Sequence, residues 1–327
     1  MPSTVAACFQ KFRENYLDLP TDLTETARAS RDFLFAQIKA LSSTTLLAGS
    51  TDSFGSFARR TKMRPLDDID CLARLSCANT SESYESGGYT YNLVAKSNAA
   101  LYTYADASGN VNSTKVLNAV KTALQSVAQY KQSGVGRDGS AVVLDLKTYS
   151  WSFDVVPTCA VANTAGDTLH FLIPDGNAKW KRTDPRIDAN RTATASAAHN
   201  GHFLRAVRLL KYWNRRVHKP RLPSYYFETL ATNRALAHPK YASLQNAIED
   251  MLYGIRETVL GACKDPKGHE PNLDRSVDND TKQKVYAAVD EAWLVSRRAI
   301  EAEVAGDQRR AVAHWQSIFG PDFPAYG

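Results

Sequence analysis

Residues 55–70 read GSFARRTKMRPLDDID, a Gly-Ser turn followed, after eleven further residues, by two carboxylates one residue apart. If the stretch from Asp67 to Leu75 is a strand, its side chains alternate between faces, so Asp68 and Asp70 share one face. Two like charges this close repel each other unless a cation lies between them. Carboxylate oxygens on a rigid strand suit a hard divalent ion such as Mg²⁺. The pattern therefore predicts a divalent-metal site.

The Gly-Ser turn before these carboxylates is suited to phosphate. Gly55 permits a tight turn, and Ser56 with the backbone N–H groups beside it can bind the phosphates that such a metal also holds. Together, the two halves of the stretch resemble the signature of the polymerase-β-like nucleotidyltransferase superfamily, and most of all the bacterial cyclic-oligonucleotide synthases. An earlier pair, Gly49-Ser50, is the alternative turn, but the spacing favours Gly55-Ser56. An ordinary hairpin with solvated charges is the alternative for the whole stretch.

A third carboxylate is implied by the resemblance, on a strand beside the Asp-x-Asp strand and in an apolar-Asp-apolar-apolar-Pro context. Residues 153–157, FDVVP, match this context and assign the role to Asp154. Apolar neighbours would bury this strand around one polar side chain, which is costly unless a metal or a partner compensates. Asp145, in VVLDLKT, is the alternative third ligand. A buried salt bridge is the alternative role for Asp154.

The second half of the chain carries further matches. Residues 174–185, PDGNAKWKRTDP, again resemble the synthases. From about residue 195 the strand patterns stop, and residues 202–217 show an amphipathic helix with a basic stripe, a pattern typical of a solvated face. Within that helix, LLKYWN is similar to the family segment whose lysine reaches the donor triphosphate. The resemblance thus implies this role for Lys211.

The segment LPSYYFE, residues 222–228, is similar to the family segment whose Ser-Tyr pair binds phosphate and stacks on a base. This implies phosphate binding by Ser224, since a serine at a helix start offers its hydroxyl and free N–H groups. It implies base stacking by Tyr225, because an aromatic ring can stack on any base. Tyr226 is the alternative stacking residue, and packing of both rings in the core is the alternative to stacking.

The remaining patterns indicate a mixture of helices and strands. They predict helices at 3–17, 21–41, 113–132, 243–263, 281–304 and 307–319, strands at 44–54, 67–75, 141–146, 151–156 and 168–174, and a loop or irregular hairpin at 79–92.

Composition sets the class of the protein. A chain of 327 residues with 43% hydrophobic and 23% charged residues predicts one globular protein of two packed units. The net charge of +6 favours anionic partners. The cysteines lack CxxC spacing, which predicts reduced, packed thiols rather than a zinc cluster or a disulfide framework. The first residues hold no long apolar run, so we expect a cytoplasmic protein without a membrane anchor. The five cysteines of the chain are Cys8, Cys71, Cys77, Cys159 and Cys263.

The resemblance implies an α+β fold, in which a polymerase-β-like nucleotidyltransferase core, a mixed sheet with helices, packs against a C-terminal helical domain. The active site would lie in the cleft between these two lobes. We expect residues 1–195 to form the catalytic core with the N-terminal helices. We expect residues 196–327 to form the helical domain that completes the nucleotide-binding cleft.

The implied activity is that of a Mg²⁺- or Mn²⁺-dependent nucleotidyltransferase. It joins nucleoside triphosphates, ATP among them, into a cyclic di- or trinucleotide second messenger and releases pyrophosphate. The metal ligands are Asp68, Asp70 and Asp154, while Ser56 and Lys211 fix the triphosphate. The family further implies anti-phage (CBASS-type) signalling, with a separate downstream effector that senses the product and room for an activating partner. We expect neither a membrane nor a stable nucleic acid as partner.

Two other functions use the same scaffold, so the fold alone does not decide between them. An RNA- or tRNA-tailing nucleotidyltransferase would use the same three carboxylates, but we find no appended RNA-binding module and no long basic tail. A non-catalytic nucleotide-binding protein or an antibiotic-modifying transferase is disfavoured by the intact carboxylates and by the C-terminal matches.

Overall fold

The computed structural model describes residues 2–85 and 88–327, and the chain folds into two compact units. The sheet unit comprises Thr21–Arg59 and Leu66–Arg186. The helical unit comprises Met1–Pro20, Arg60–Pro65 and Ile187–Gly327. The short piece Arg60–Pro65 lies in sequence inside the Gly-Ser/Asp-x-Asp stretch, yet it belongs to the helical unit.

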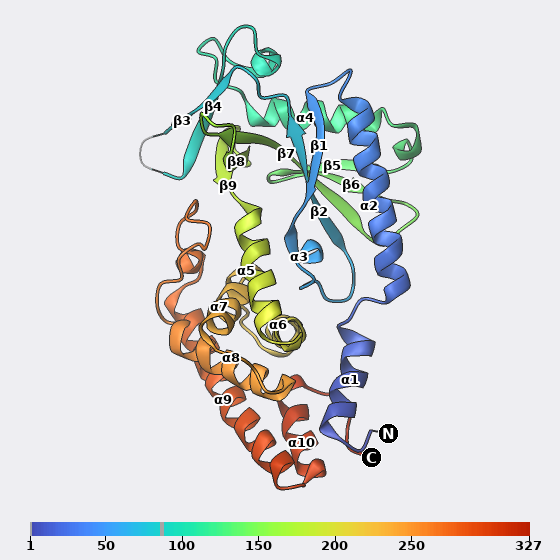
Figure 1. Ribbon diagram of the computed structural model, residues 1–327, viewed down its shortest axis with the longest axis vertical. Helices are drawn as coiled ribbons and strands as arrows, with labels where there is room; N and C mark the ends of the chain where they lie inside the picture. Colours follow the sequence, from blue (N-terminus) through green and yellow to red (C-terminus); the bar gives the residue numbers. More distant parts are fainter. Residues whose placement is uncertain (1, 86–87) are drawn as a thin grey trace. The chain divides into compact units, whose positions relative to one another are not determined.

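Nine strands of the described chain form one mixed sheet in the sheet unit (Figure 1). Along the sheet the order is β1-β2-β7-β8-β9-β4-β3, while β6 pairs with β7 and β5 pairs with β6. The pairing of β2 with β7 is parallel, and the other pairings are antiparallel. The strands are β1 (Leu47–Ser53), β2 (Asp68–Leu75), β3 (Thr80–Tyr84), β4 (Thr90–Ala95), β5 (Gly134–Asp138), β6 (Ala141–Asp145), β7 (Ser152–Ala162), β8 (Thr168–Pro174) and β9 (Trp180–Thr183).

Helices cover the sheet within this unit. Helix α2 packs on β1, and α4 packs on β5, β6, β7 and β8. The buried residues of α2 are Ala27, Leu34 and Ile38, whose spacing places them on one helical face. Helix α4 begins after Asn112, whose side chain accepts a hydrogen bond from the N–H of Lys115. The helices of the sheet unit are α2 (Thr21–Leu41), α3 (Gly55–Ala58), η1 (Ala100–Tyr104), α4 (Ser113–Gln125) and η2 (Ala128–Tyr130).

The helical unit is built around one apolar cluster. Its centre is rich in aromatic rings: Phe9 and Phe12 of α1 pack edge-on against Phe323, and Phe9 also packs edge-on against Trp315. The helices that contribute to this unit are α1 (Val5–Tyr16), α5 (Pro185–Ala198), α6 (His202–Tyr212), the π-helix η3 (Trp213–Val217), α7 (Ser224–Ala237), α8 (Leu244–Thr258), η4 (Leu273–Ser276), α9 (Asn279–Val304) and α10 (Gln308–Phe319).

Most predicted elements are present. The strands expected at 141–146 and 151–156 form the antiparallel pair β6 and β7, and among the described residues no strand follows β9. The helix expected at 113–132 is shorter, because α4 ends at Gln125, where the hydroxyl of Ser126 donates to the carbonyl of Ala123. At 79–92 the hairpin alternative is correct, with β3 paired to β4, and residues 86–87 lie outside the described part.

None of the helices in the described ranges combines the length and the apolar character that crossing a bilayer requires.

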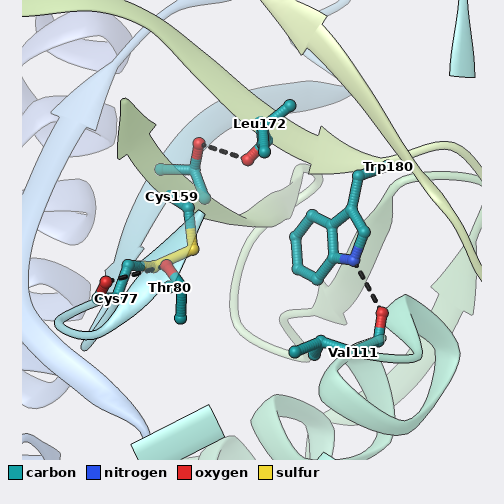
Figure 2. The surroundings of a disulfide bond; sticks show 7 residues. Cys77, Thr80, Val111, Cys159, Leu172 and Trp180 are labelled. Carbon is teal, nitrogen blue, oxygen red and sulfur yellow. Dashed lines mark hydrogen bonds between the residues drawn. A yellow bond between two sulfur atoms is a disulfide. The ribbon is translucent and has the colours of Figure 1, made fainter. Parts of the chain in front are cut away.

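The prediction of reduced thiols is wrong for two of the five cysteines. Cys77 and Cys159 form a disulfide with a Cα–Cα distance of 5.9 Å (Figure 2). Cys159 lies on β7 and Cys77 just beyond β2, and these two strands run parallel in a register that ends at Arg74 and Thr158. The register therefore brings together two cysteines 82 residues apart. The other three, Cys8, Cys71 and Cys263, are free and buried, as predicted.

Candidate active site

The two carboxylates of the Asp-x-Asp motif lie on one face of β2. Asp68 and Asp70 are half-buried, whereas Ile69 and Cys71 between and after them are almost completely buried. This is the alternation that the sequence predicts for a strand with one face in the core. Burial, together with the nearby carboxylates of Asp70 and Asp154, raises the pKa of the Cys71 thiol. Cys71 is thus a protonated core residue and not a nucleophile.

Asp154 joins these two carboxylates through strand pairing. In the parallel pairing of β2 with β7, Asp70 is the direct partner of Asp154, and Asp68 is the partner of Ser152. Residues Phe153 and Val155 on either side of Asp154 are fully buried, whereas Asp154 is half-buried. The strand therefore directs this one polar side chain to the face that carries the other two carboxylates.

The three side chains form a group suited to a metal ion. One carboxylate oxygen from each of Asp68, Asp70 and Asp154 lies within 4.8 Å of the other two. Hard oxygen donors in such a group are the ligands that Mg²⁺ and Mn²⁺ prefer. The alternative third ligand, Asp145, is exposed at the end of β6. Among the described residues, the acidic group of this site consists of the three predicted aspartates.

Gly55 lies against Asp70, and this contact explains why the turn needs glycine. Strand β1 runs antiparallel to β2, and the N–H of Phe54 donates to the carbonyl of Asp70 at 3.2 Å. The chain then turns at Gly55 with a φ of +73°. A Cβ atom built on Gly55 would lie 1.7 Å from Oδ2 of Asp70. Ser56 follows as the second residue of α3 and is half-buried.

Lys211 lies in the helical unit, where it is 7% exposed. Its ammonium donates to Oε2 of Glu228 at 2.7 Å and to the carbonyl of Thr61 at 3.1 Å. The Thr61 hydroxyl donates to the other carboxylate oxygen of Glu228 at 3.0 Å. Lys211 and Glu228 thus compensate each other's buried charge. Because both also bond to Thr61, they hold the segment Arg60–Pro65 to α6 and α7.

Two further contacts hold the same segment within the helical unit. Arg208 of α6 donates to the carbonyl of Arg60 at 2.7 Å, and Arg64 donates to the carbonyl of Asp18 at 2.5 Å. The segment Arg60–Pro65 is therefore fixed by several contacts within the helical unit.

Ser224 and Tyr225 open α7. Ser224 is exposed at the first position of the helix, and Tyr225 is half-buried. Tyr226, the alternative stacking residue, is 1% exposed, and its hydroxyl donates to the carbonyl of Val259. A ring so completely packed is a core residue, so of the two tyrosines Tyr225 is the one that is partly exposed.

Comparison with known proteins adds the relatives of this chain. No protein-family model matches it. A probable cyclic nucleotide synthase of Bacillus cereus (strain VD146) is 30% identical over 332 residues, which span 100% of this chain and 99% of the relative. The chain belongs to the cyclic nucleotide synthases. The expectation of a nucleotidyltransferase that makes cyclic oligonucleotides is confirmed at the level of the family.

A second cyclic nucleotide synthase, the cyclic AMP-AMP-AMP synthase of Acinetobacter sp. (strain ATCC 27244 / 9458), is 26% identical over 221 residues. The match covers 64% of this chain and 60% of that protein.

Solved structures of synthases share the fold. CdnC of E. coli MS115-1, in complex with HORMA-deltaN, has a TM-score of 0.71 at 17% identity, with 98% of each chain covered. Vibrio cholerae DncV, a cyclic AMP-GMP synthase solved with the linear intermediate 5' pppA(3',5')pG, has a TM-score of 0.66 at 12% identity, covering 100% of this chain and 98% of that one. At these identities the likeness concerns the fold, and it confirms the expected α+β class.

Sequence reasoning missed the partners of Lys211 and Tyr225. Glu228 stands in a run of buried positions of α7, and a charged residue in such a run signals a buried partner, here Lys211. Lys267, which contacts Tyr225, lies in a polar loop and leaves no such signal. Its role depends on a contact between residues 42 positions apart.

Proposed function

We propose that this cyclic nucleotide synthase joins nucleoside triphosphates, ATP among them, into a cyclic di- or trinucleotide and releases pyrophosphate at each bond. The observation that carries the proposal is the group formed by Asp68, Asp70 and Asp154 on two paired strands. Three carboxylates on one face repel each other unless a cation lies among them, so this group favours a metal-dependent enzyme.

The three aspartates hold Mg²⁺ or Mn²⁺ in this proposal. When bound there, the metal neutralises charge on the donor phosphates and on the pyrophosphate that leaves. Asp68 and Asp70 fix its position from β2. Asp154 also orients the ribose hydroxyl of the acceptor nucleotide for in-line attack on the α-phosphate. The hydroxyl gives its proton to a carboxylate oxygen of Asp154, its oxygen bonds to the α-phosphorus, and the bond from that phosphorus to the bridging oxygen of the leaving pyrophosphate breaks.

The nucleotide contacts are assigned to individual residues as follows. Gly55 leaves room for Asp70, and the hydroxyl of Ser56 binds the triphosphate. The ammonium of Lys211 donates a hydrogen bond to the triphosphate. An ammonium has three N–H donors, and two of them bond to Glu228 and Thr61, so the third is the one that binds phosphate. Ser224 binds phosphate.

Tyr225 stacks on a base, a contact that contributes about 1 to 3 kcal/mol in single-strand binding proteins. Residues 1–195 act as the catalytic core and residues 196–327 complete the nucleotide site. For cyclisation, the linear intermediate re-enters with its 5′-triphosphate as donor, so the same residues serve every bond.

The cellular role that we propose follows from membership of the cyclic nucleotide synthases. The enzyme acts in the cytoplasm in anti-phage (CBASS-type) signalling, and a separate downstream effector senses its product. An activating partner is compatible with this scheme. Neither a membrane nor a stable nucleic acid partner is part of it.

Incubation of the pure protein with the four ribonucleoside triphosphates and Mg²⁺ or Mn²⁺ tests the proposal. Mass spectrometry after phosphatase treatment should reveal a compact, phosphatase-resistant cyclic product. Asp68→Asn and Asp70→Asn should abolish this product. A matched control is Asp280→Asn, which changes an exposed carboxylate on α9 and should leave the product unchanged.

The same assay with an added RNA oligonucleotide separates this function from RNA tailing. A ladder of extended RNA with no cyclic product would overturn the proposal. A cyclic product that persists in Asp68→Asn and Asp70→Asn would show that the chemistry belongs to another site.

A further inference from the structure

Tyr225 is held by charged residues from two other segments of the helical unit. Its hydroxyl donates to Oδ1 of Asp188 on α5 at 2.8 Å and accepts from the ammonium of Lys267 at 2.8 Å. The same ammonium lies 3.6 Å from Oδ2 of Asp188. Hydrogen bonds to charged groups are roughly twice as strong as those between neutral groups. The phenol therefore has one preferred orientation.

Lys267 also lies over the ring of Tyr225. Its Nζ atom is 4.3 Å from the ring centroid, within the range of a cation–π contact. The ammonium thus adds an electrostatic contact with the ring to its hydrogen bond with the hydroxyl.

The position of Lys267 is itself fixed by a buried carboxylate. The side chain of Asp265 has no exposed surface, and its Oδ1 lies 3.2 Å from the ammonium of Lys267. Asp265 also accepts hydrogen bonds from the backbone N–H groups of Lys267, His269 and Glu270. These contacts with the buried carboxylate of Asp265 fix the conformation of residues 265–270, and they hold Lys267 next to Tyr225.

We propose that Asp188 and Lys267 are positioning residues, which hold the ring of Tyr225 in the orientation that stacks on the base of a nucleoside triphosphate. This inference rests on the proposed function and on Tyr225 as the stacking residue. A ring that is already ordered loses less conformational freedom when the nucleotide binds. Without these contacts the ring must be ordered by the nucleotide itself, which weakens binding by about three- to tenfold.

Tyr225→Phe is the sharpest test, because it keeps the ring and removes the hydroxyl on which both partners act. We expect the KM for nucleoside triphosphates to rise about three- to tenfold, with a smaller change in kcat. Lys267→Met removes the charge at similar length and should raise the KM no more than Tyr225→Phe does, because the hydrogen bond to Asp188 remains. The double variant should match Tyr225→Phe, which already lacks the hydrogen bond to Lys267.

A binding measurement that needs no turnover accompanies the kinetics. The fluorescent probe is 2-aminopurine ribonucleoside triphosphate, whose emission falls when the base stacks. Titration should show quenching with wild-type protein, a similar three- to tenfold weaker affinity in Tyr225→Phe, and no stacking signal in Tyr225→Ala.

Lys282→Met is the matched control. Lys282 pairs with Asp274 at 2.7 Å in the same region and is as little exposed as Lys267. It should leave the KM unchanged. Melting temperatures of all variants are measured in parallel, so that loss of folded protein is separated from loss of affinity.

An unchanged KM and probe affinity in Tyr225→Phe and Lys267→Met, with or without a lower melting temperature, would show a purely structural network and overturn the inference. So would effects that multiply in the double variant. These outcomes leave the proposed function intact, provided that the wild-type protein makes a cyclic product. Absence of that product is instead a failure of the proposed function, and the probe titration still reports on the ring.

Discussion

Gly55 and Asp70 are so close that no side chain fits between them: a Cβ atom on Gly55 would lie 1.7 Å from Oδ2 of Asp70 and 2.4 Å from its Cγ. The clash is with the carboxylate that we propose as a metal ligand, at the group formed with Asp68 and Asp154. The turn and the Asp-x-Asp motif are thus one steric unit, although eleven residues separate Ser56 from Asp68 in the sequence.

Gly55→Ala should therefore abolish most of the activity by moving Asp70. Displacement of a catalytic group by about 1 Å costs on the order of a hundredfold, so we expect kcat/KM to fall by at least about that factor. The backbone at φ +73° adds strain for any side chain and should lower stability by about 1 to 3 kcal/mol. Steady-state kinetics and thermal unfolding measure the two effects.

Gly139→Ala separates strain from contact. Gly139 also has a positive φ, of +50°, but a Cβ atom there meets nothing within 4 Å. This variant should lose stability and keep its activity. If Gly55→Ala behaves like Gly139→Ala, the contact with Asp70 has no catalytic consequence.

Exchange of Asp154 or Asp145 for asparagine decides which acidic residue is the third ligand. The two residues lie on neighbouring strands, but only Asp154 belongs to the carboxylate group. Asp154→Asn should lower kcat/KM by about a hundredfold or more, since loss of several kcal/mol of metal stabilisation corresponds to such a factor. Asp145→Asn should behave like the wild-type protein.

Although Asp154→Asn should lower the activity, it should not lower the thermal stability of the metal-free protein. In EDTA the three carboxylates repel each other, so removing one charge should leave the melting temperature equal to or above that of the wild type. Added Mg²⁺ should raise the wild-type melting temperature and have less effect on the variant, because only ligand bound to the folded state stabilises. A marked destabilisation in EDTA would contradict this and favour the buried salt bridge that the sequence left open.

Much of this site could be predicted from local sequence. Alternation along β2 predicts that Asp68 and Asp70 share one face. The apolar neighbours of Asp154 predict a buried strand in which this one polar side chain needs a metal or a partner. These are properties of a few adjacent residues. They follow from the two-residue period of a strand and the cost of burying a carboxylate.

What could not be predicted depends on which strands are neighbours. The disulfide between Cys77 and Cys159 needs the parallel register of β2 and β7, and nothing in either cysteine's own surroundings reveals it. Likewise, the membership of Arg60–Pro65 in the helical unit depends on Lys211 and Glu228, which are more than a hundred residues away in sequence. Tertiary packing, and not local propensity, decides such contacts.

Breaking the pair of Lys211 and Glu228 should destabilise the protein strongly. Both side chains are less than 10% exposed, and their charged atoms lie 2.7 Å apart. Removal of one partner from a buried pair leaves an uncompensated charge and costs about 3 to 5 kcal/mol. Glu228→Gln and Lys211→Met should each lower the free energy of unfolding by such an amount in denaturant titrations. The double variant should recover part of the loss.

Kinetics at a temperature where both variants are folded separate the two roles of Lys211. If its ammonium also binds the triphosphate, Lys211→Met should raise the KM for nucleoside triphosphates well above that of Glu228→Gln. Equal KM values would limit Lys211 to holding the segment that contains Thr61. If both variants unfold with the same free energy as the wild type, the ion pair of Lys211 and Glu228 does not stabilise the fold.

The disulfide makes a prediction about thiol titration. Of the five cysteines, three are free and buried, so the denatured, unreduced protein should show three reactive thiols with Ellman's reagent and five after reduction. In a separate sample, cells lysed into denaturant with an alkylating agent should yield protein with three alkylated cysteines and two cysteines that become reactive only after reduction, as counted by mass spectrometry. Five thiols before reduction would show that Cys77 and Cys159 are unpaired.

The same bond should contribute to stability through the unfolded chain. It links residues 82 positions apart, and in the chain-entropy account a loop of this length stabilises the folded state by about 4 kcal/mol. Reduction with dithiothreitol should therefore lower the melting temperature of the wild type. The variant Cys77→Ser/Cys159→Ser should melt at that lower temperature with or without dithiothreitol. Since the bond joins the strands that carry Asp70 and Asp154, activity should be lost at a lower temperature as well, and an unchanged melting temperature after complete reduction would contradict this account.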